Sequence, residues 1–559
     1  MRRDVFLAAI LLGILLRLLF IWQAPFTNDE GAYLYDARVV TEGRLPAGDT
    51  IAKTPVSLLL FSSAVHVSGH SLLAARAVAL TLNLLTLIPL FYAAKLISGP
   101  RAASLAVVIW SLGAGPIAMY SLGLSEAVAA FFALTSLACW LAVPNVNYQR
   151  ASLPLILAFL TGLSFALAYA SRKTSLAVGV TLFAIYLYSP PRRLKYLVLV
   201  AAGAQVVVVP WLLVLNEFYG LPGVLEAVGM GYGSIIGERL NGSAGSWGGG
   251  FLWAFEVVAR VATPLVMLLF LSISSFGSQL ALAGRATWIT KKLWLISTIL
   301  AAATASVLLY GKTTTTELLL AVCYALFAWV LWLATTTVPR LPIWPTLVAS
   351  SWFLCLGGLY LLWPTFLPDY AADFFPAVTL FGAAVIAGLS RRTVLGHALI
   401  TLLIISNVLS LMSAYNTSWL GTFNRAAVLE AAAMIRNTVP PDEEIFTAAV
   451  IVPYASGHRA MADLSHPYWY QYTFIDPTIR NVFLPPQQKI ALLLEQDCVQ
   501  WAVVEHLTRY AFLTPPNVAV ANFERDWQLR QEFKNVTSFR PNTLKLYHKE
   551  QPRDHGCDP

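Results

Sequence analysis

The segment from residue 28 to residue 36 combines carboxylates and tyrosines just after an apolar run. Asp29 and Glu30 are adjacent, and Tyr33 and Asp36 follow them closely. A carboxylate at the edge of a low-dielectric region is partly desolvated, which makes it a better general base. Adjacent acids also repel one another, so they lose their protons at different pH values. We therefore predict Asp29 as a catalytic base, with Glu30 orienting the segment or sharing the proton.

We predict residues 27–55 as the first extracytoplasmic loop and the one that carries the catalytic residues. A single lysine, Lys53, lies near its end. Its ammonium is a point charge suited to binding phosphate. The alternative is an interfacial lysine whose stem covers apolar surface. The acids also have structural alternatives: Asp29 could solvate a loop or cap a helix, and Glu30 and Tyr33 could serve structure alone.

These residues must be positioned by helices that cross a membrane. Of the 559 residues, 57% are hydrophobic and only 12% are charged, whereas a soluble domain carries about 25% charged residues. A membrane helix needs about 20 mainly apolar residues, and we expect about 11–13 of them. The candidate runs are 4–22, 71–97, 101–120, 124–143, 152–170, 174–188, 195–215, 251–273, 292–310, 315–337, 341–363, 371–389 and 394–413.

Basic residues predict which side of the membrane each connection faces, because Lys and Arg gather in cytoplasmic loops. With a cytoplasmic N-terminus, nearly every compact basic cluster falls on the inner side and the C-terminus lies outside. The first run is expected to be an uncleaved anchor, because it is longer than the core of a signal peptide. We expect an integral multi-pass protein of a plasma membrane, with the lipid bilayer as its surroundings.

Three further charged residues fall on the predicted outer side. Arg172 and Lys173 form the exceptional basic pair, and they could neutralise a phosphate or simply anchor a helix at the interface. Glu126 opens the fourth run, where it could bind hydroxyl groups, hold Arg172 or interact with the helix dipole. Nearly all acids before residue 420 share this side, which favours polar chemistry there over loops that are merely solvated.

Residues 422–559 are predicted to form a soluble extracytoplasmic α/β domain after the membrane part, residues 1–415. Helical and strand-like patterns alternate there. The expected helices are Arg425–Asn437 and Gln487–Gln496, and the expected strands are Ile445–Val452, Val499–Val504 and Thr543–Tyr547.

The domain shows no convincing metal or nucleic-acid signal. His458, Asp463 and His466 could form a metal cluster, but their spacing matches no zinc or iron site, so a surface or interface role is favoured. A Cys498–Cys557 bridge would require an oxidising compartment. The net charge of +8 comes from the membrane part, so we expect no nucleic-acid partner.

The order of these features resembles the GT-C glycosyltransferases, and most closely the protein O-mannosyltransferases and the aminoarabinose transferases of lipid A. The resemblance covers nearly all of residues 1–415. It starts from an Asp-Glu pair after the first run and a Lys-x-Pro motif that enters an apolar segment. Further matching positions are Ala75-Arg76, the stretch 93–103, Ser125-Glu126, Asp369-Tyr370 and Phe375-Pro376.

Two positions depart from the pattern of this family. Ala52 stands where related transferases often have an acid before the lysine, and Asp369 stands where they usually have an arginine. The second departure leaves the late loop without its usual phosphate-binding cation, and Arg172 and Lys173 could substitute for it.

The resemblance implies a polytopic α-helical membrane protein of the GT-C type, with Asp29 as the general base of an inverting transfer. The donor would be a hexosyl or mannosyl sugar on a polyprenyl phosphate of the dolichyl type. The acceptor would be a hydroxyl of a protein, lipid or glycan. No tightly held metal is needed, because cationic side chains can neutralise the phosphate, although a divalent cation is compatible. The residues implied in binding are Lys53, Arg172 and Lys173 for the phosphate and Tyr33, Glu126, Asp369 and Tyr370 for sugar or acceptor.

Three other classes of protein compete with this interpretation. A secondary transporter would place ionisable residues near the middle of the bilayer and between internal repeats, and the sequence shows neither. A flippase for polyprenyl-linked sugars would need an outer phosphate site but not Asp29. A scaffold or receptor would leave the acid-rich first loop unexplained.

Overall fold

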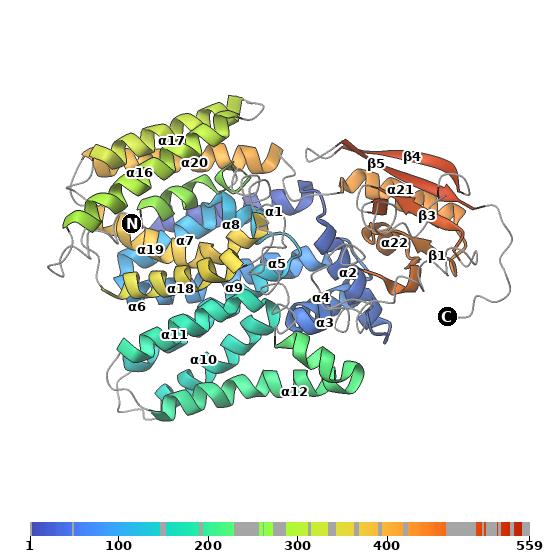
Figure 1. The fold of residues 1–559 in the computed structure, drawn as a ribbon, viewed down its shortest axis with the longest axis horizontal. Coiled ribbons are helices and arrows are strands. Elements are labelled where there is room, and N and C mark those ends of the chain that lie inside the picture. The colour runs from blue at the N-terminus through green and yellow to red at the C-terminus, as the bar shows by residue number, and fades with distance from the viewer. Residues whose placement is uncertain are drawn as a thin grey trace.

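Apolar helices form a bundle at one end of the molecule, and a small sheet domain lies at the other (Figure 1). This computed structural model describes residues 3–46, 50–145, 152–188, 194–228, 257–260, 262–271, 287–310, 315–333, 343–362, 368–389, 394–416, 423–465, 499–505, 508–509, 523, 527–536 and 541–549. The helices of the first half are α1 Arg3–Gln23, α2 Asn28–Thr41, α3 Thr50–Lys53, α4 Pro55–Ser68, α5 Ala74–Leu85, α6 Leu87–Ser98, α7 Pro100–Leu112, α8 Ala114–Met119, α9 Ser125–Ala142, α10 Ser152–Ser171, α11 Leu176–Tyr188 and α12 Leu194–Ala227. The later helices are α16 Thr287–Tyr310, α17 Thr315–Leu333, α18 Ile343–Leu362, α19 Phe375–Leu389, α20 Val394–Asn416, α21 Arg425–Thr438 and α22 Ile451–Ser456, with short 3-10 turns η1 Val143–Asn145, η2 Lys173–Ser175, η4 Pro368–Phe374 and η5 Met461–Asp463.

Seven of the described helices are long and apolar enough to cross a membrane. The protein is therefore an integral membrane protein of the polytopic helical class, as the sequence predicts. Each predicted run is mainly helical where the structure describes it, and the run 251–273 is described only at 257–260 and 262–271. The seven spans are Arg3–Gln23, Ala74–Ser98, Ser125–Asn145, Ser152–Ser171, Leu194–Leu225, Tyr370–Gly388 and His397–Tyr415.

The predicted run 101–120 is interrupted rather than continuous. It divides at Gly113 into α7 and α8, and side chains from other helices satisfy the freed backbone groups. Asn407 donates to the Leu112 carbonyl at 2.8 Å and accepts from the Ala114 amide at 3.0 Å. Such a break is tolerated inside a bundle only where neighbouring helices restore the hydrogen bonds.

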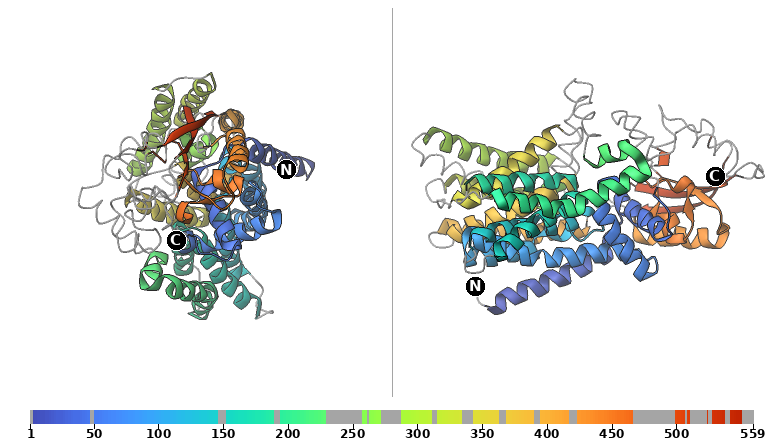
Figure 2. Two further views of the ribbon diagram at one scale, coloured as in Figure 1. Left: turned by 90° about the vertical axis from the view of Figure 1, so that its right-hand side faces the viewer. Right: turned by 90° about the horizontal axis from the view of Figure 1, so that it is seen from below.

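The C-terminal domain contains a five-stranded mixed sheet with the order β2-β1-β3-β5-β4. The strands β2, β1 and β3 are parallel, and β3, β5 and β4 are antiparallel. Figure 2 shows this sheet from two further directions, at the end of the molecule away from most of the bundle. The strands are β1 Glu444–Phe446, β2 Arg459–Ala460, β3 Trp501–Val504, β4 Gln528–Val536 and β5 Pro541–His548.

One predicted strand is wrong in extent. The sequence favours a strand over 445–452, but β1 ends at Phe446 and Ile451 begins helix α22. The apolar residues after β1 are buried against α2 and α21, so tertiary packing overrides the strand propensity. The predicted helix Gln487–Gln496 lies outside the described residues, as do His466, Cys498 and Cys557.

The C-terminal domain shares its hydrophobic core with the first helices of the chain. One cluster of buried side chains includes Phe26 and Phe61 from the N-terminal part and Val428 and Ile451 from the C-terminal part. The backbones of Phe26 and Phe423 also form a two-way bridge, with N–O distances of 2.8 and 3.0 Å. The tail is therefore packed onto the segment that follows α1.

Helices α10 and α12 touch at two glycines, Gly162 and Gly203. A substitution at this contact therefore tests the fold. A Cβ added at Gly162 would lie 1.8 Å from the Val200 carbonyl oxygen, a backbone atom that cannot rotate away. We predict that Gly162→Ala lowers the stability of the purified protein by about 2 kcal/mol, because overpacking has this magnitude. Thermal unfolding in detergent measures the loss.

The matched control for this prediction is Gly358→Ala in α18. A Cβ there meets nothing within 4 Å, and the helix-propensity gain is the same at both positions. Equal thermal stability of the two variants would contradict the observed contact between α10 and α12.

Candidate active site

The local sequence places Asp29 in the first turn of α2. Thr27 caps this helix: its hydroxyl accepts from the Glu30 amide at 2.9 Å, and the Glu30 carboxylate accepts from the Thr27 amide at 3.4 Å. This reciprocal arrangement is a capping box, which sets where a helix begins. Asp29 is half-buried beside it, where the positive end of the helix dipole favours a carboxylate.

Glu30 forms a fully buried ion pair with Arg76 of α5. The guanidinium donates to both carboxylate oxygens, Nε to Oε1 at 2.6 Å and a terminal nitrogen to Oε2 at 2.8 Å. The Gly123 amide also donates to Oε1 at 3.0 Å, and both side chains are 0% exposed. These surroundings are those of a residue that positions α2, whereas the neighbouring Asp29 reaches a less buried face.

Arg76 also binds the chain that links α1 to α2. Its terminal nitrogens donate to the carbonyls of Ile21, Ala24 and Pro25 at 2.7–2.8 Å. The ring of Phe26 lies 4.3 Å from the guanidinium carbon. One arginine thus fixes the end of α1 and the start of α2 together.

Tyr33 lies one turn after Asp29 and connects α2 to α9. Its hydroxyl hydrogen-bonds the side chains of Ser125 and Thr54, and the charges of Glu126 and Asp29 act on it. Burial, followed by these negative charges, raises the pKa of Tyr33 well above its usual range. The phenol therefore stays protonated and can act as a hydrogen-bond donor between Asp29 and Glu126.

Lys53 ends the short helix α3, which is attached to α2 by a buried side-chain contact. The Thr50 hydroxyl donates to the carboxylate of Asp36, and both side chains are buried. Thr54 continues the turn through its amide, which donates to the Thr50 carbonyl at 2.8 Å. Lys53 itself is half-buried, and the Thr50–Asp36 contact ties its short helix to the helix that carries Asp29.

Lys173 supports this segment from the other side. Its ammonium donates to the carbonyls of Ala52 and Ala227, the first at 3.2 Å. It also lies 4.1 Å from the centre of the Trp211 ring, whose indole nitrogen donates to the Ile51 carbonyl at 3.3 Å. The structure therefore brings Lys173 to the main chain of Ala52, the residue that precedes Lys53.

Arg172 lies between two carboxylates. It donates to Glu126 at 2.7 Å and contacts Asp373 at 2.9 Å, and the guanidinium carbon lies 5.6 Å from the centre of the Tyr370 ring. The structure brings the predicted residues Arg172, Glu126 and Tyr370 together. With both carboxylates ionised, the three charged side chains sum to −1.

Asp373 is the residue that sequence reasoning missed. Its carboxylate accepts from the Tyr360 hydroxyl, and its carbonyl accepts from the Trp352 indole at 3.2 Å. The sequence does carry one signal for it: Asp373 stands directly before two phenylalanines, the second of which, Phe375, begins α19. Asp369 lies in η4, and its side chain is outside the described part of the structure.

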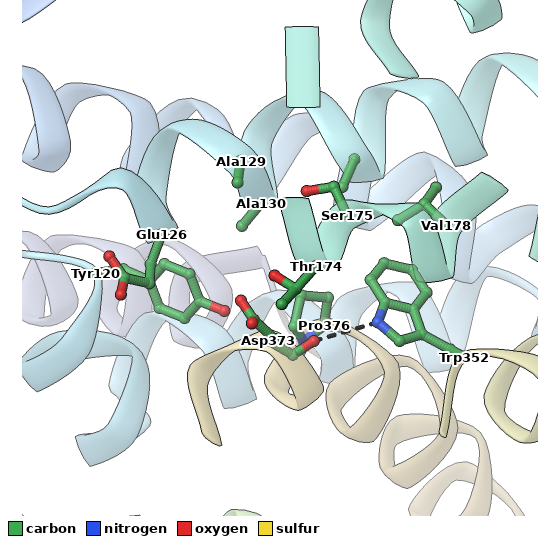
Figure 3. A pocket seen from close by; sticks show the side chains of 11 residues that line it. Tyr120, Glu126, Ala129, Ala130, Thr174, Ser175, Val178, Trp352, Asp373 and Pro376 are labelled. Carbon is green, nitrogen blue, oxygen red and sulfur yellow. Dashed lines mark hydrogen bonds between the residues drawn. The ribbon is translucent and has the colours of Figure 1, made fainter. Parts of the chain in front are cut away.

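A small cavity lies beside these charges, as Figure 3 shows. Glu126 and Asp373 both line it, and Tyr120 and Trp352 add aromatic walls. Its volume of about 20 Å³ admits one or a few water molecules rather than a sugar. The remaining lining residues are Ala129, Ala130, Ala133, Thr174, Ser175, Val178 and Pro376.

Among the described residues, no group of three or more His, Cys, Asp and Glu side chains could hold a metal ion. The two ring nitrogens of His458 lie 3.1 Å from the Ser456 hydroxyl and 3.2 Å from the Val439 carbonyl. Asp463 is engaged with Tyr35 and two arginines. Both residues therefore serve the interior and the interface of the C-terminal domain.

Comparison with solved structures identifies the fold. The chain matches ArnT from Cupriavidus metallidurans bound to undecaprenyl phosphate, with a TM-score of 0.57, 12% identity and coverage of 99% of this chain and 100% of that one. It matches the apo state of the same protein with a TM-score of 0.52, 15% identity and 97% coverage of each chain. The oligosaccharyltransferase of Archaeoglobus fulgidus, tethered to an acceptor peptide, matches with a TM-score of 0.50, 12% identity and coverage of 98% of this chain and 74% of that one.

These proteins are GT-C glycosyltransferases, so the GT-C fold expected from the sequence is confirmed. No protein-family model matches the chain, and no curated protein matches it by sequence. The likeness is therefore one of architecture.

The buried ion pair gives a test of how the site is built. We predict that Arg76→Leu destabilises the protein by about 3–5 kcal/mol, because it leaves the Glu30 carboxylate buried without its partner. The yield of monodisperse protein in size-exclusion chromatography and its thermal unfolding measure this loss. Arg3→Leu, at an exposed position of α1, is the control and should leave both unchanged.

Proposed function

We propose that this GT-C-fold chain is a membrane glycosyltransferase that moves a sugar from a polyprenyl phosphate to an acceptor hydroxyl. The observation that carries the proposal is the arrangement around α2. A half-buried carboxylate at its start, Asp29, shares a face with Tyr33, and Asp36 on that face holds the helix that ends at Lys53. The match to ArnT bound to undecaprenyl phosphate supports a donor of this lipid class.

In the proposed reaction, Asp29 takes the proton from the acceptor hydroxyl as that oxygen attacks the anomeric carbon. The bond between this carbon and the phosphate oxygen breaks in the same step, so the configuration inverts. The leaving polyprenyl phosphate gains negative charge, and the Lys53 ammonium stabilises it as the charge develops. Tyr33 donates a hydrogen bond in the space between the base and Glu126.

The two other cations are better suited to positioning than to neutralising a phosphate. Arg172 already lies against the carboxylates of Glu126 and Asp373, and a phosphate would have to compete with both. Lys173 holds the backbone beside Lys53. We assign Glu30 a positioning role through Arg76, because its carboxylate is fully buried.

The carboxylates at the edge of the cavity, which itself admits only water-sized groups, favour hydroxyl groups over a phosphate beside them. Glu126 and Asp373 can accept hydrogen bonds from sugar hydroxyls, and Tyr370 and Trp352 offer aromatic faces. We propose a hexosyl donor, of which mannosyl is the first choice, and a protein, lipid or glycan acceptor. The reaction would take place at the extracytoplasmic face, with the C-terminal domain on that side, and it is compatible with a divalent cation.

The first functional test compares transfer by wild type and Asp29→Asn. Purified protein receives radiolabelled polyprenyl-phosphate hexose and membrane acceptors. We predict a loss of at least about a hundredfold in the variant, because general base catalysis contributes about 10²–10⁴. Asp4→Asn, at an exposed site in the first turn of α1, is the matched control and should transfer normally.

Other outcomes of the same assay separate the competing functions. Wild-type transfer that Asp29→Asn leaves intact would keep the enzyme and discard the base. Donor binding without transfer across a broad set of acceptors would favour a flippase for polyprenyl-linked sugars. A secondary transporter predicts neither donor binding nor transfer.

A second test addresses the phosphate. We predict that Lys53→Ala weakens binding of the polyprenyl phosphate by about 10–100-fold, since a hydrogen bond to a charged group contributes about 1.5–3 kcal/mol. Competition by unlabelled polyprenyl phosphate in the transfer assay measures the affinity. Lys95→Ala, on the exposed end of α6, is the control, and equal affinities for both variants would remove Lys53 from the site.

A further inference from the structure

Helix α2 presents two different faces to two parts of the molecule. Residues at positions i, i+4 and i+7 share one face of a helix, and Asp29, Tyr33 and Asp36 have this spacing. A second set with the same spacing starts two positions later, so it is rotated by about 200° around the helix. This second set faces the C-terminal domain and consists of Gly31, Tyr35 and Arg38.

The C-terminal domain approaches the second face closely. A Cβ added at Gly31 would lie 3.0 Å from the Cβ of Ile451 in α22 and 3.4 Å from its backbone nitrogen. The Arg38 guanidinium donates to the carbonyls of Gly457 and His458 at 2.9 and 3.0 Å. The domain therefore contacts α2 along about two turns.

A buried hydrogen-bond network lies at the centre of this contact. The Tyr35 hydroxyl donates to the Asp463 carboxylate at 2.8 Å and accepts from the Ala460 amide at 2.8 Å. Arg44 and Arg459 bind the other oxygen of the same carboxylate, the second at 3.1 Å. Burial raises the pKa of Tyr35 to about 12, so its hydroxyl remains a donor throughout the physiological range.

The backbone at Asp463 is strained in a way that serves this contact. Ala462 and Asp463 both have φ of +53°, the left-handed region that residues with a Cβ seldom adopt. The Glu444 carboxylate accepts from the Ala462 amide at 2.9 Å and helps to hold the turn. Strain of this kind persists only where surrounding contacts impose it, and it is concentrated at functional positions.

We infer that the C-terminal domain positions the catalytic helix, and that Asp463 acts through Tyr35 as a positioning residue for the transfer. This inference rests on the proposed function, because it assigns α2 the base of the reaction. The helix is a short rigid element, so a tilt at Tyr35 displaces Asp29, one and a half turns away. Small displacements of a reacting group reduce turnover strongly.

The test uses two mild variants and one matched control. Tyr35→Phe removes only the hydroxyl, and Asp463→Asn removes the charge while keeping the shape. Tyr454→Phe is the control: it belongs to the same interface, but its hydroxyl donates to the Ser71 carbonyl at 3.1 Å, in the segment before α5 rather than in α2. All three are compared after size-exclusion chromatography, which establishes that they are folded.

For the transfer reaction we expect kcat to fall by at least about tenfold in Tyr35→Phe and in Asp463→Asn, with KM for the lipid-linked donor unchanged. The double variant should lose no more than the worse single variant, because both substitutions break one contact. Tyr454→Phe should keep the wild-type kcat. The inference would be overturned if Tyr454→Phe lost as much kcat as the other two variants. It would also be overturned if Tyr35→Phe and Asp463→Asn raised only KM.

Hydrogen–deuterium exchange of the α2 amides gives a readout that needs no activity. We expect faster exchange across Asn28–Thr41 in Asp463→Asn than in wild type or Tyr454→Phe. Unchanged exchange would overturn the positioning role even if the enzyme transfers sugar. If the wild-type protein transfers no sugar but exchange is still faster in Asp463→Asn, the proposed function is refuted. The mechanical coupling between the domain and α2 would then still stand.

Discussion

The ion pair between Glu30 and Arg76 is the interaction on which the candidate active site depends. Two opposite charges with no exposed surface are expensive to desolvate, and only good geometry with further hydrogen bonds offsets that expense. Here the pair is bidentate, Gly123 contributes an amide, and Arg76 binds three carbonyls at the end of α1. The first turn of α2 is therefore held in place, and Asp29 with it.

The charges around the cavity follow the same physical rule. Glu126, Arg172 and Asp373 come from three separate segments and compensate one another, which is how buried ionisable groups are tolerated. Lys173 satisfies its donors with backbone carbonyls and an aromatic ring. In the proposed reaction Lys53 binds the phosphate of the leaving group. Glu126 and Asp373 lie apart from it and accept hydrogen bonds from hydroxyl groups.

The C-terminal domain belongs to the site as much as the bundle does. Its core merges with that of α2 and α4, and the Tyr35–Asp463 contact lies on the face of α2 opposite to the proposed base. The sequence suggests a separate module after residue 415, because hydropathy drops there. Hydropathy reports the surroundings of a segment, however, and says nothing about which surface a polar domain packs against.

Sequence alone determined the features that depend on neighbouring residues. Apolar length predicts the membrane helices. The capping box between Thr27 and Glu30 is also local, but it was the structure that showed helix α2, with Asp29 in its first turn, inside the segment predicted as a loop. The pairing of charges is different, because it depends on segments that only the folded chain brings together. Arg172 meets Asp373 across 201 positions, and Tyr35 meets Asp463 across 428. The tertiary structure therefore decided which acids are partners, which cation supports the backbone, and that Glu30 is fully buried while its neighbour Asp29 is only half-buried.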